Sequence, residues 1–280
     1  MLPSELTVDV LVLGAGPGGY TAAFRAADLG KKVAIVERDP MLGGVCLNVG
    51  CIPSKALLHA AKVIEETREM AGAGLDFAAP RIDLDKLRAW KAGIVGRLTS
   101  GLATLARQRK VTVVTGSGRF VSPHAMEVTR GETVCRIAFT HAIVAAGSAP
   151  VQLPFVAASD PCVMDSTAAL DLADVPKRLL VIGGGIIGLE MATVYHALGS
   201  RVSVVELMDQ IIPGADKDIV SPLLKHIKAR YEGIHLGTKV TRVECGAAGL
   251  TVMLESGGAS RSETFDKILV AAGRAPNGNH

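Results

Sequence analysis

The strongest constraint on the fold of this chain is a 28-residue pattern that occurs twice. Residues 10–37 read VLVLGAGPGGYTAAFRAADLGKKVAIVE and residues 179–206 read LLVIGGGIIGLEMATVYHALGSRVSVVE, and they align without a gap at a constant offset of 169. Each copy has an apolar run, the motif G-x-G-x-x-G, a stretch typical of a helix, and a second apolar run ending in a glutamate. This order predicts a strand, a tight turn, a helix and a parallel strand, the dinucleotide-binding form of a β-α-β unit.

The residue types in the repeat indicate how each copy would bind a dinucleotide. The glycines permit a tight turn and let backbone N–H groups approach a pyrophosphate at a helix N-terminus, where the helix dipole favours anions. The terminal acid accepts hydrogen bonds from an adenosine ribose and would repel a 2′-phosphate. The candidate residues are Gly14, Gly16, Gly19 and Glu37 in the first copy, and Gly183, Gly185, Gly188 and Glu206 in the second. We therefore expect an α/β fold with two Rossmann-like dinucleotide-binding domains in tandem.

Length and composition agree with two domains and argue against several classes of partner. A chain of 280 residues suits two domains, and an apolar content of 49% supports packed cores. The net charge of +3 includes no basic run, so nucleic acid is not indicated. No segment approaches about 18 uninterrupted apolar residues, so no membrane span is predicted, and the first ten residues do not resemble a signal peptide. Five cysteines, three of them scattered singly, favour a cytoplasmic protein.

Turn residues and periodicity divide the chain. We expect the first domain at residues 1–150 and the second at 151–277, beginning with a Pro- and Asp-rich connector, with 278–280 as the first residues of a further region. Helices are predicted from about Cys51 to Met70, over 83–110 and near 215–231, and further strands at 111–115, at 141–145, within 234–256 and at 267–273. Both domains close on the same short sequence, VAAGSAP and VAAGRAP.

The chemical centre of the sequence is the segment GGVCLNVGCIPSK, residues 43–55. Four residues separate Cys46 from Cys51, and the flanking glycines permit a tight loop. Cys51 is expected at a helix N-terminus, where the dipole favours the thiolate, and Lys55, one turn on, adds a second positive influence. A zinc site would need two more ligands, which the sequence does not supply, and a structural disulfide is disfavoured in a reducing compartment. The pattern therefore predicts a redox-active disulfide and no metal site.

Glu190 stands out because the first copy of the repeat has Thr21 at the matching position. An acid there lies in the first turns of the predicted helix, near where the two domains would meet. The residues alone leave two interpretations open, a functional acid or an exposed glutamate stabilised by the helix dipole.

With these motifs identified, the chain resembles the dihydrolipoyl dehydrogenase family of the class I pyridine nucleotide-disulfide oxidoreductases. GGVCLNVGCIPSKALLH matches the redox segment of that family nearly residue for residue, GGGIIGLEMATVYHALGS matches its NAD-domain fingerprint, and the resemblance covers residues 8–277. It implies FAD at the first fingerprint and NAD at the second. It also implies the oxidation of protein-bound dihydrolipoamide to lipoamide. Dihydrolipoamide would reduce the Cys46–Cys51 disulfide, Cys51 would pass electrons to FAD, and the reduced flavin would deliver hydride to NAD⁺.

The resemblance also implies roles for individual residues. Cys46 would be the interchange thiol that meets dihydrolipoamide, and Cys51 the charge-transfer thiol against the flavin. Lys55 would lie near flavin N5 and form an ion pair with Glu190 across the two domains, which makes Glu190 a functional residue. The other FAD-binding residues implied are Gly44, Gly118 and Gly147. The residues expected to line the NAD pocket are Val240, Ala271, Ala272, Gly273 and Arg274.

Family members continue beyond the point where this sequence stops. They have a segment that completes the FAD site and a dimer-interface domain with a His-Glu general base, and none of the seven histidines here lies in that context. We therefore expect a chain truncated before these parts, with weak FAD binding and little lipoamide turnover alone. The resemblance implies a homodimer for full-length members. The implied partner is the lipoylated acyltransferase of a 2-oxo acid dehydrogenase complex or the lipoylated glycine-cleavage protein.

Other interpretations remain. The chain could be an FAD/NAD-binding module without lipoamide turnover. A glutathione reductase would be expected to carry arginines after the second acid for an NADP phosphate, whereas Leu-Met-Asp-Gln follows Glu206. A mercuric reductase usually carries extra cysteines at its ends, and a soluble transhydrogenase normally lacks the cysteine that stands here as Cys46.

Overall fold

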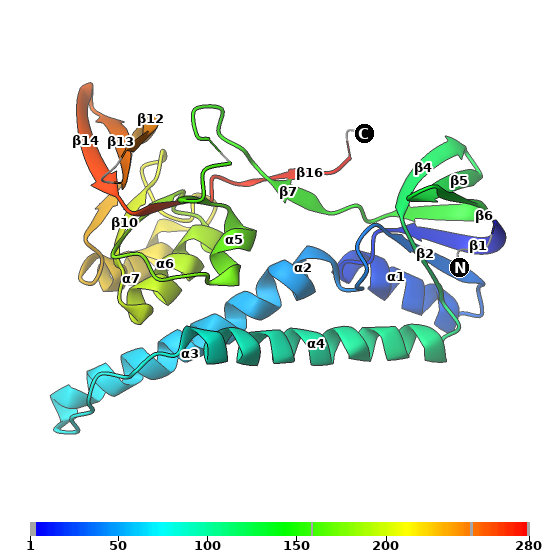
Figure 1. Cartoon of the computed structure of the whole chain (residues 1–280), viewed down its shortest axis with the longest axis horizontal. Helices are drawn as coiled ribbons and strands as arrows, with labels where there is room; N and C mark the ends of the chain where they lie inside the picture. The colour runs from blue at the N-terminus through cyan, green and yellow to red at the C-terminus, as the bar shows by residue number, and fades with distance from the viewer. Residues whose placement is uncertain (1–3, 158, 247–248, 279–280) are drawn as a thin grey trace. The chain divides into compact units, whose positions relative to one another are not determined.

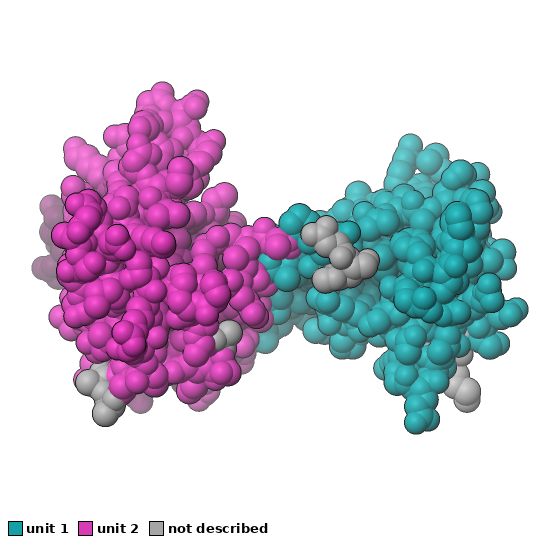
Figure 2. All heavy atoms as spheres, turned by 90° about the horizontal axis from the view of Figure 1, so that it is seen from above, with its two compact units in different colours: residues 1–53, 92–149, 276–280 teal, residues 54–91, 150–275 magenta. Residues whose placement is uncertain are grey.

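The structure is a computed structural model that describes residues 4–157, 159–246 and 249–278 (Figure 1). Contacts divide the chain into two compact units, coloured separately in Figure 2. The first unit comprises residues 1–53, 92–149 and 276–280, and the second comprises 54–91 and 150–275. The chain changes unit after residues 53, 91, 149 and 275. The domain limits 1–150 and 151–277 stay a prediction. Of the expected start of a further region, Asn279 and His280 lie outside the described residues.

The first unit contains a six-stranded sheet with the order β3-β2-β1-β6-β5-β4. Its parallel strands are β1 (Glu5–Leu13), β2 (Val33–Glu37), β3 (Thr112–Thr115) and β6 (Thr133–Val144). The antiparallel strands β4 (Ser117–Ser122) and β5 (Ala125–Arg130) extend the sheet beyond β6. Helix α1 (Pro17–Asp28) joins β1 to β2, as the repeat predicts. The sequence did not predict β4, β5 or the first half of β6.

Strand β2 shows why this sheet is buried on both faces. Ala34 and Val36 belong to one hydrophobic cluster with residues of β5 and β6, whereas Val33 and Ile35 belong to another with residues of α1. All four side chains are at most 1% exposed. Successive side chains of a strand point to opposite faces, and a strand buried on both sides reads as an unbroken apolar run, which is typical of parallel sheets.

Four helical segments lie between β2 and β3. They are α2 (Gly44–Val49), α3 (Cys51–Glu69), a 3₁₀ turn (Met70–Ala73) and α4 (Leu84–Gln108). The predicted helices from Cys51 and over 83–110 are therefore present. The tight loop predicted before Cys51 is instead the short helix α2, which contains Cys46. Gly50 separates α2 from α3, because its φ of −146° and ψ of −116° lie outside the helical region.

The second unit contains a five-stranded parallel sheet with the order β11-β10-β9-β15-β8. Its strands are β8 (Val163–Met164), β9 (Arg178–Ile182), β10 (Arg201–Val205), β11 (Gly233–His235) and β15 (Lys267–Val270). The accompanying helices are α5 (Ser166–Asp171), α6 (Ile186–Leu198) and α7 (Lys217–Lys228). A separate antiparallel sheet contains β12 (Lys239–Gly246), β13 (Gly249–Ser256) and β14 (Ala259–Phe265). Strands β7 (Ser148–Pro150) and β16 (Arg274–Pro276) form a two-stranded sheet.

The two parallel sheets share one topology. The order β11-β10-β9-β15 repeats the order β3-β2-β1-β6, with the same β-α-β unit at the centre of each. In β9, Leu179 and Val181 belong to one apolar cluster, and Leu180 and Ile182 to the other. The predicted α/β class with two Rossmann-like units is confirmed. Within the described ranges, the structure contains no helix that combines the length and the apolar character needed to cross a membrane.

Candidate dinucleotide and redox sites

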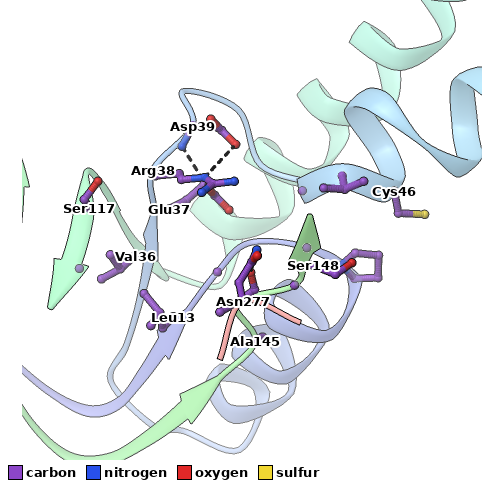
Figure 3. A pocket seen from close by; sticks show the side chains of 18 of the residues that line it. Leu13, Val36, Glu37, Arg38, Asp39, Cys46, Ser117, Ala145, Ser148 and Asn277 are labelled. Carbon is purple, nitrogen blue, oxygen red and sulfur yellow. Dashed lines mark hydrogen bonds and ion pairs between the residues drawn. The ribbon is translucent and has the colours of Figure 1, made fainter. Parts of the chain in front are cut away.

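A cavity of about 370 Å³ opens at the carboxyl end of β1 and β2 in the first unit (Figure 3). Figure 3 shows that its labelled side chains come from β1, β2, α2, β4 and β7 and from the segments that follow β2, β6 and β16. The predicted site residues that line it are Gly14, Gly16, Glu37, Gly44, Cys46, Gly118 and Gly147. The fold therefore brings the first glycine loop, the redox segment and the end of the first domain to one cavity.

A second cavity, of about 600 Å³, occupies the equivalent place in the second unit. The predicted residues that line it are Gly183, Gly185, Glu206, Val240, Ala271, Ala272, Gly273 and Arg274. Eight lining positions of the two cavities correspond at the offset of 169. In the first they are Leu13, Gly14, Gly16, Pro17, Val36, Glu37, Arg38 and Asp39, and in the second Ile182, Gly183, Gly185, Ile186, Val205, Glu206, Leu207 and Met208. The two cavities are thus the same site built twice.

The three glycines of the first motif are required for different reasons. Gly14 has φ of +98°, and a Cβ there would lie 2.2 Å from the carbonyl oxygen of Ala145. A Cβ on Gly19, which is buried behind the loop, would lie 1.8 Å from the carbonyl oxygen of Gly14. Gly16 differs, because its φ of −70° suits any residue and a Cβ would come no closer than 3.9 Å to its nearest neighbour, the Cα atom of Gly44. Chain packing therefore explains Gly14 and Gly19 but not Gly16.

The second motif repeats this division. A Cβ on Gly183 would lie 2.4 Å from the carbonyl oxygen of Ala271, and one on Gly188 would lie 2.1 Å from that of Gly183. Gly185 has φ of −77°, and a Cβ there would meet no described atom within 4 Å. The middle glycine of each motif therefore leaves open space on the cavity side.

The open space at Gly16 and Gly185 fits a phosphate group of a dinucleotide. Each residue is the N-cap of the following helix, α1 or α6, and as a glycine it supplies no capping side chain. The first N–H groups of a helix need partners from outside the helix, and the helix dipole favours an anion there. A side chain at either position would occupy the volume through which a pyrophosphate approaches these donors.

The terminal acid of each unit connects two loops. In the first unit, Glu37 Oε2 accepts the N–H of Ala15 at 2.7 Å and its Oε1 accepts that of Asp39 at 3.1 Å. In the second unit, Glu206 Oε2 accepts the N–H of Gly184 at 2.7 Å and its Oε1 accepts that of Met208 at 2.9 Å. Carboxylate oxygens have further lone pairs that remain available to ribose hydroxyls. The acids therefore also brace the glycine loops, a role that the motif alone did not indicate.

The residues after the two acids give the cavities different rims. Arg38 and Asp39 follow Glu37 and form an ion pair with an N–O distance of 3.9 Å. Leu207 and Met208 stand at the matching positions of the second cavity, where they are 64% and 51% exposed. The rim of the first cavity is charged at these positions, and that of the second is apolar.

The redox segment lies directly on the first glycine loop. The N–H of Gly43 donates to the carbonyl oxygen of Ala15 at 2.8 Å. A Cβ on Gly44 would lie 2.6 Å from the Cα atom of Gly16, so the two backbones are in contact. Cys46 is half-buried and lines the cavity. Cys51 is exposed at the first residue of α3, the predicted place, and does not line the cavity.

Asn48, between the two cysteines, fixes the shape of this segment. Its Nδ2 donates to the carbonyl oxygens of Leu42 at 3.2 Å and Gly44 at 3.1 Å. Its Oδ1 lies 3.4 Å from Oγ1 of Thr99, a buried residue of α4. The amide of Asn48 thus links α2 to the turn before it and to α4. Asn48 was not among the residues predicted from the sequence, because no spacing rule marks an asparagine of this kind.

Lys55 and Glu190 form the predicted ion pair, with Nζ 2.5 Å from Oε1. The pair was expected across two domains, but both residues belong to the second unit. The reason is that α3 packs into that unit after its first turn, where Leu57 is 1% exposed in one apolar cluster with residues of α6. The predicted site residues that line neither cavity are Gly19, Cys51, Lys55, Gly188 and Glu190.

Several residues that line the cavities were not predicted from the sequence. Asn277 lines the first cavity, where its Nδ2 donates to the carbonyl oxygen of Ala146 and its backbone N–H to that of Gly147, both at 2.9 Å. In the second cavity, Leu153 and Phe155 come from the connector. The constant offset between the two copies could have identified the pairs that follow Glu37 and Glu206. It gives no signal for Asn277, Leu153 or Phe155, which lie outside the repeat.

Comparison with known proteins agrees with this geometry. The family model for pyridine nucleotide-disulphide oxidoreductases matches residues 8–280. The chain is 54% identical over 278 residues to a dihydrolipoyl dehydrogenase of Vibrio cholerae, covering 99% of this chain and 58% of that protein. It is 46% identical over 274 residues to a dihydrolipoyl dehydrogenase of Thermus scotoductus, covering 96% and 58%.

A solved structure shows the same fold. The Cu(II) complex of the HOCl-induced flavoprotein disulfide reductase RclA from Escherichia coli superposes with a TM-score of 0.81 at 28% sequence identity, covering 97% of this chain and 58% of that one. The chain thus spans 58% of the length of these three relatives. On the family match and the sequence identities, the chain belongs to the pyridine nucleotide-disulphide oxidoreductase family.

Proposed function

We propose that this chain carries the FAD, NAD and redox-disulfide sites of a dihydrolipoyl dehydrogenase, which oxidises protein-bound dihydrolipoamide to lipoamide with NAD⁺ as acceptor. The observation that carries the proposal is that Cys46 lines the same cavity as the first glycine loop, whereas none of the described residues that line the second cavity is a cysteine. A thiol pair that exchanges electrons with a flavin needs the flavin at the first site, which leaves NAD for the second.

The residues of the first site bind and orient. The loop at Gly16 and the N-terminus of α1 bind the pyrophosphate, and Glu37 accepts hydrogen bonds from the ribose. Cys46 exchanges with the dihydrolipoamide thiols, which leave as the lipoamide disulfide while the Cys46–Cys51 disulfide becomes two thiols. An FAD held in this cavity would supply the acceptor for the two electrons of the thiol pair and the donor of hydride to NAD⁺. Cys51 stands at the N-terminus of α3, where the dipole favours an anion.

The residues of the second site bind NAD, and Lys55, the last residue of the redox segment, pairs with Glu190. Gly185 and the N-terminus of α6 bind the NAD pyrophosphate, and Glu206 selects a free 2′-hydroxyl. Glu190 holds the ammonium group of Lys55 one helical turn beyond Cys51 on α3. We propose a catalytic role for this pair on the family resemblance. The proposed partners are a lipoylated acyltransferase or a lipoylated glycine-cleavage protein, with a homodimer as the full-length assembly and a cytoplasmic location.

The test uses the purified chain with added FAD. Dihydrolipoamide and NAD⁺ should together produce NADH at a low rate, because weak FAD binding and little lipoamide turnover are expected of this chain alone, and omission of dihydrolipoamide should abolish the signal. Cys46→Ser and Cys51→Ser should each abolish it too while NAD binding by calorimetry is unchanged. Mass spectrometry after alkylation should show the Cys46–Cys51 disulfide before dithiothreitol and two labelled thiols after it. Complete labelling of both thiols in air without reductant would contradict the redox assignment. Binding of both dinucleotides without NADH formation would favour a binding module.

A further inference from the structure

Asn277 holds one wall of the first cavity in place. Its side-chain Nδ2 donates to the carbonyl oxygen of Ala146, and its backbone N–H donates to that of Gly147, both at 2.9 Å. All three residues line the cavity and belong to the first unit, and Figure 3 shows Asn277 in this cavity. Two successive carbonyl groups of the wall are therefore bonded to one residue.

The same wall lies directly on the first glycine loop. The N–H of Ala145 donates to the carbonyl oxygen of Leu13 at 2.8 Å. The carbonyl oxygen of Ala145 is the atom that a Cβ on Gly14 would meet at 2.2 Å. Contacts with β1 and the glycine loop thus fix the first residue of the wall, and the two bonds from Asn277 fix the next two residues.

A comparison of the two domain ends separates the role of the side chain from that of the backbone. The matching sequences VAAGSAP and VAAGRAP are followed by Val151 and by Asn277. The N–H of Val151 donates to the carbonyl oxygen of Gly273 at 3.0 Å, as the N–H of Asn277 donates to that of Gly147. Valine has no side-chain donor, and Val151 is not among the described residues that line the second cavity. The backbone bond is therefore common to both units, and the side-chain amide is an addition at the first cavity.

This addition matters because the ligand proposed for the first cavity is an anion. Among the described residues that line the cavity, Glu37 and Asp39 are acids, and Arg38 is a base that pairs with Asp39. A carbonyl oxygen without a donor would add negative potential beside a pyrophosphate, and it would draw the wall towards conformations in which it finds a partner. The amide of Asn277 satisfies the carbonyl group of Ala146 without adding a charge.

We propose that Asn277 is a positioning residue for FAD, an inference that rests on the assignment of FAD to the first cavity. Its amide keeps Ala146 and Gly147 in the conformation that binds the dinucleotide. Only molecules with this wall in place bind, so loss of the amide lowers the apparent affinity for FAD in proportion to the fraction that stays competent. The affinity of the second site does not depend on Asn277, because the matching residue there, Val151, has no side-chain amide.

The experiment titrates the full chain with FAD, followed by flavin fluorescence, and with NAD, followed by calorimetry. Asn277→Ala should weaken FAD binding about fivefold, the effect of one ordinary hydrogen bond, and leave the affinity for NAD unchanged. The matched control is Gln210→Ala in the second unit, where Nε2 donates to the carbonyl oxygen of Ala215 at 2.9 Å. This control also loses an amide that donates to a backbone carbonyl, and it should leave FAD binding unchanged. Circular dichroism confirms that each variant is folded.

Asn277→Asp distinguishes the positioning of an anionic ligand from a general loosening of the wall. The substitution keeps the shape of the side chain, replaces the donor by an acceptor and adds a negative charge, so FAD should bind more weakly than to Asn277→Ala. Because salt screens charges, this difference between the two variants should narrow between about 0.01 and 0.5 M salt. Parent-like FAD binding by Asn277→Ala, an equal loss of NAD binding, or a difference that salt does not change would overturn the inference. Absence of FAD binding by the parent chain would overturn the FAD assignment itself, and the inference with it.

Discussion

The ammonium nitrogen of Lys55 lies 2.5 Å from a carboxylate oxygen of Glu190, within one compact unit. The side chain of Lys55 is 61% exposed and that of Glu190 is 22% exposed, so water screens the pair. The repeat left open whether Glu190 is functional or merely an exposed helix residue. The contact shows that Glu190 pairs with Lys55 of α3, and a functional role for this pair stays a prediction.

The substitution Glu190→Gln should lower the rate of lipoamide-dependent NADH formation more than it lowers the free energy of unfolding. Because exposed ion pairs contribute little, the free energy of unfolding in urea should fall by no more than about 1 kcal/mol. Lipoamide-dependent NADH formation should fall further, because Lys55 loses the partner that positions it. Glu66→Gln, which breaks the exposed Lys62–Glu66 pair on the same helix, is the matched control and should leave turnover unchanged. Equal turnover in both variants would contradict the proposed role of Glu190.

Alanine at the glycines should separate binding from folding. Gly16→Ala and Gly185→Ala meet open space and should retain the stability of the parent chain, but each should abolish dinucleotide binding at its own site. Gly19→Ala and Gly188→Ala place a Cβ within 2.1 Å of a carbonyl oxygen and should lower the thermal midpoint of unfolding. Calorimetry and thermal denaturation measure the two effects. Normal binding by Gly16→Ala would mean that no ligand uses the space beside it.

The two acids should control their sites independently. Glu206→Gln removes the negative charge that would face a 2′-phosphate, so the preference for NAD over NADP should narrow in calorimetric titrations. Glu37→Gln should weaken FAD binding and leave the affinity for NAD unchanged. Because each acid also accepts two backbone N–H groups, both variants should lose some affinity for their own dinucleotide. NADP binding equal to or tighter than NAD binding in the parent chain would overturn the assignment.

Asn48→Ala should loosen the redox segment without unfolding the chain. The substitution removes hydrogen bonds to the carbonyl oxygens of Leu42 and Gly44, each worth about 1 kcal/mol. Alkylation of Cys46, which is half-buried in the parent, should become faster, whereas alkylation of the exposed Cys51 should change less. Timed alkylation with mass spectrometry measures both rates. Asn48→Asp, which keeps one acceptor oxygen but loses both donors, should resemble alanine, and parent-like rates in both variants would refute the role.

The stability of the second unit should fall in mild acid. Burial, together with the positive charges of Arg68 and Arg230, lowers the pKa of His196 in spite of Glu65, which raises it. The unfolded chain therefore binds more protons, and the contribution of His196 is complete above about pH 6.5 and is lost as the pH falls from there through the folded pKa. His196→Gln should reduce the difference in unfolding free energy between about pH 7.5 and 5.5. His141→Gln, at an exposed histidine, is the control, and an unchanged difference in His196→Gln would contradict the prediction.

The sequence by itself determined the two dinucleotide units. The first glycine of each motif needs a positive φ, the third must lie against the first, and the acid closes the same loop, so all the constraints fall within one 28-residue segment. The start of α3 at Cys51 and the extent of α4 followed from similarly local signals, helix-terminus chemistry and periodicity. A pattern whose residues all lie within one short segment can be recognised from the sequence alone.

Only the tertiary structure decided which segments share a site. Asn277 lines the first cavity although residues 271–274, a few positions before it, line the second. Helix α3 packs into the second unit although its first residue belongs to the first. Each of these contacts depends on where the chain returns in space. Contacts between single residues from distant segments follow no periodic pattern and no fixed sequence spacing. One sequence therefore does not indicate which residues will meet.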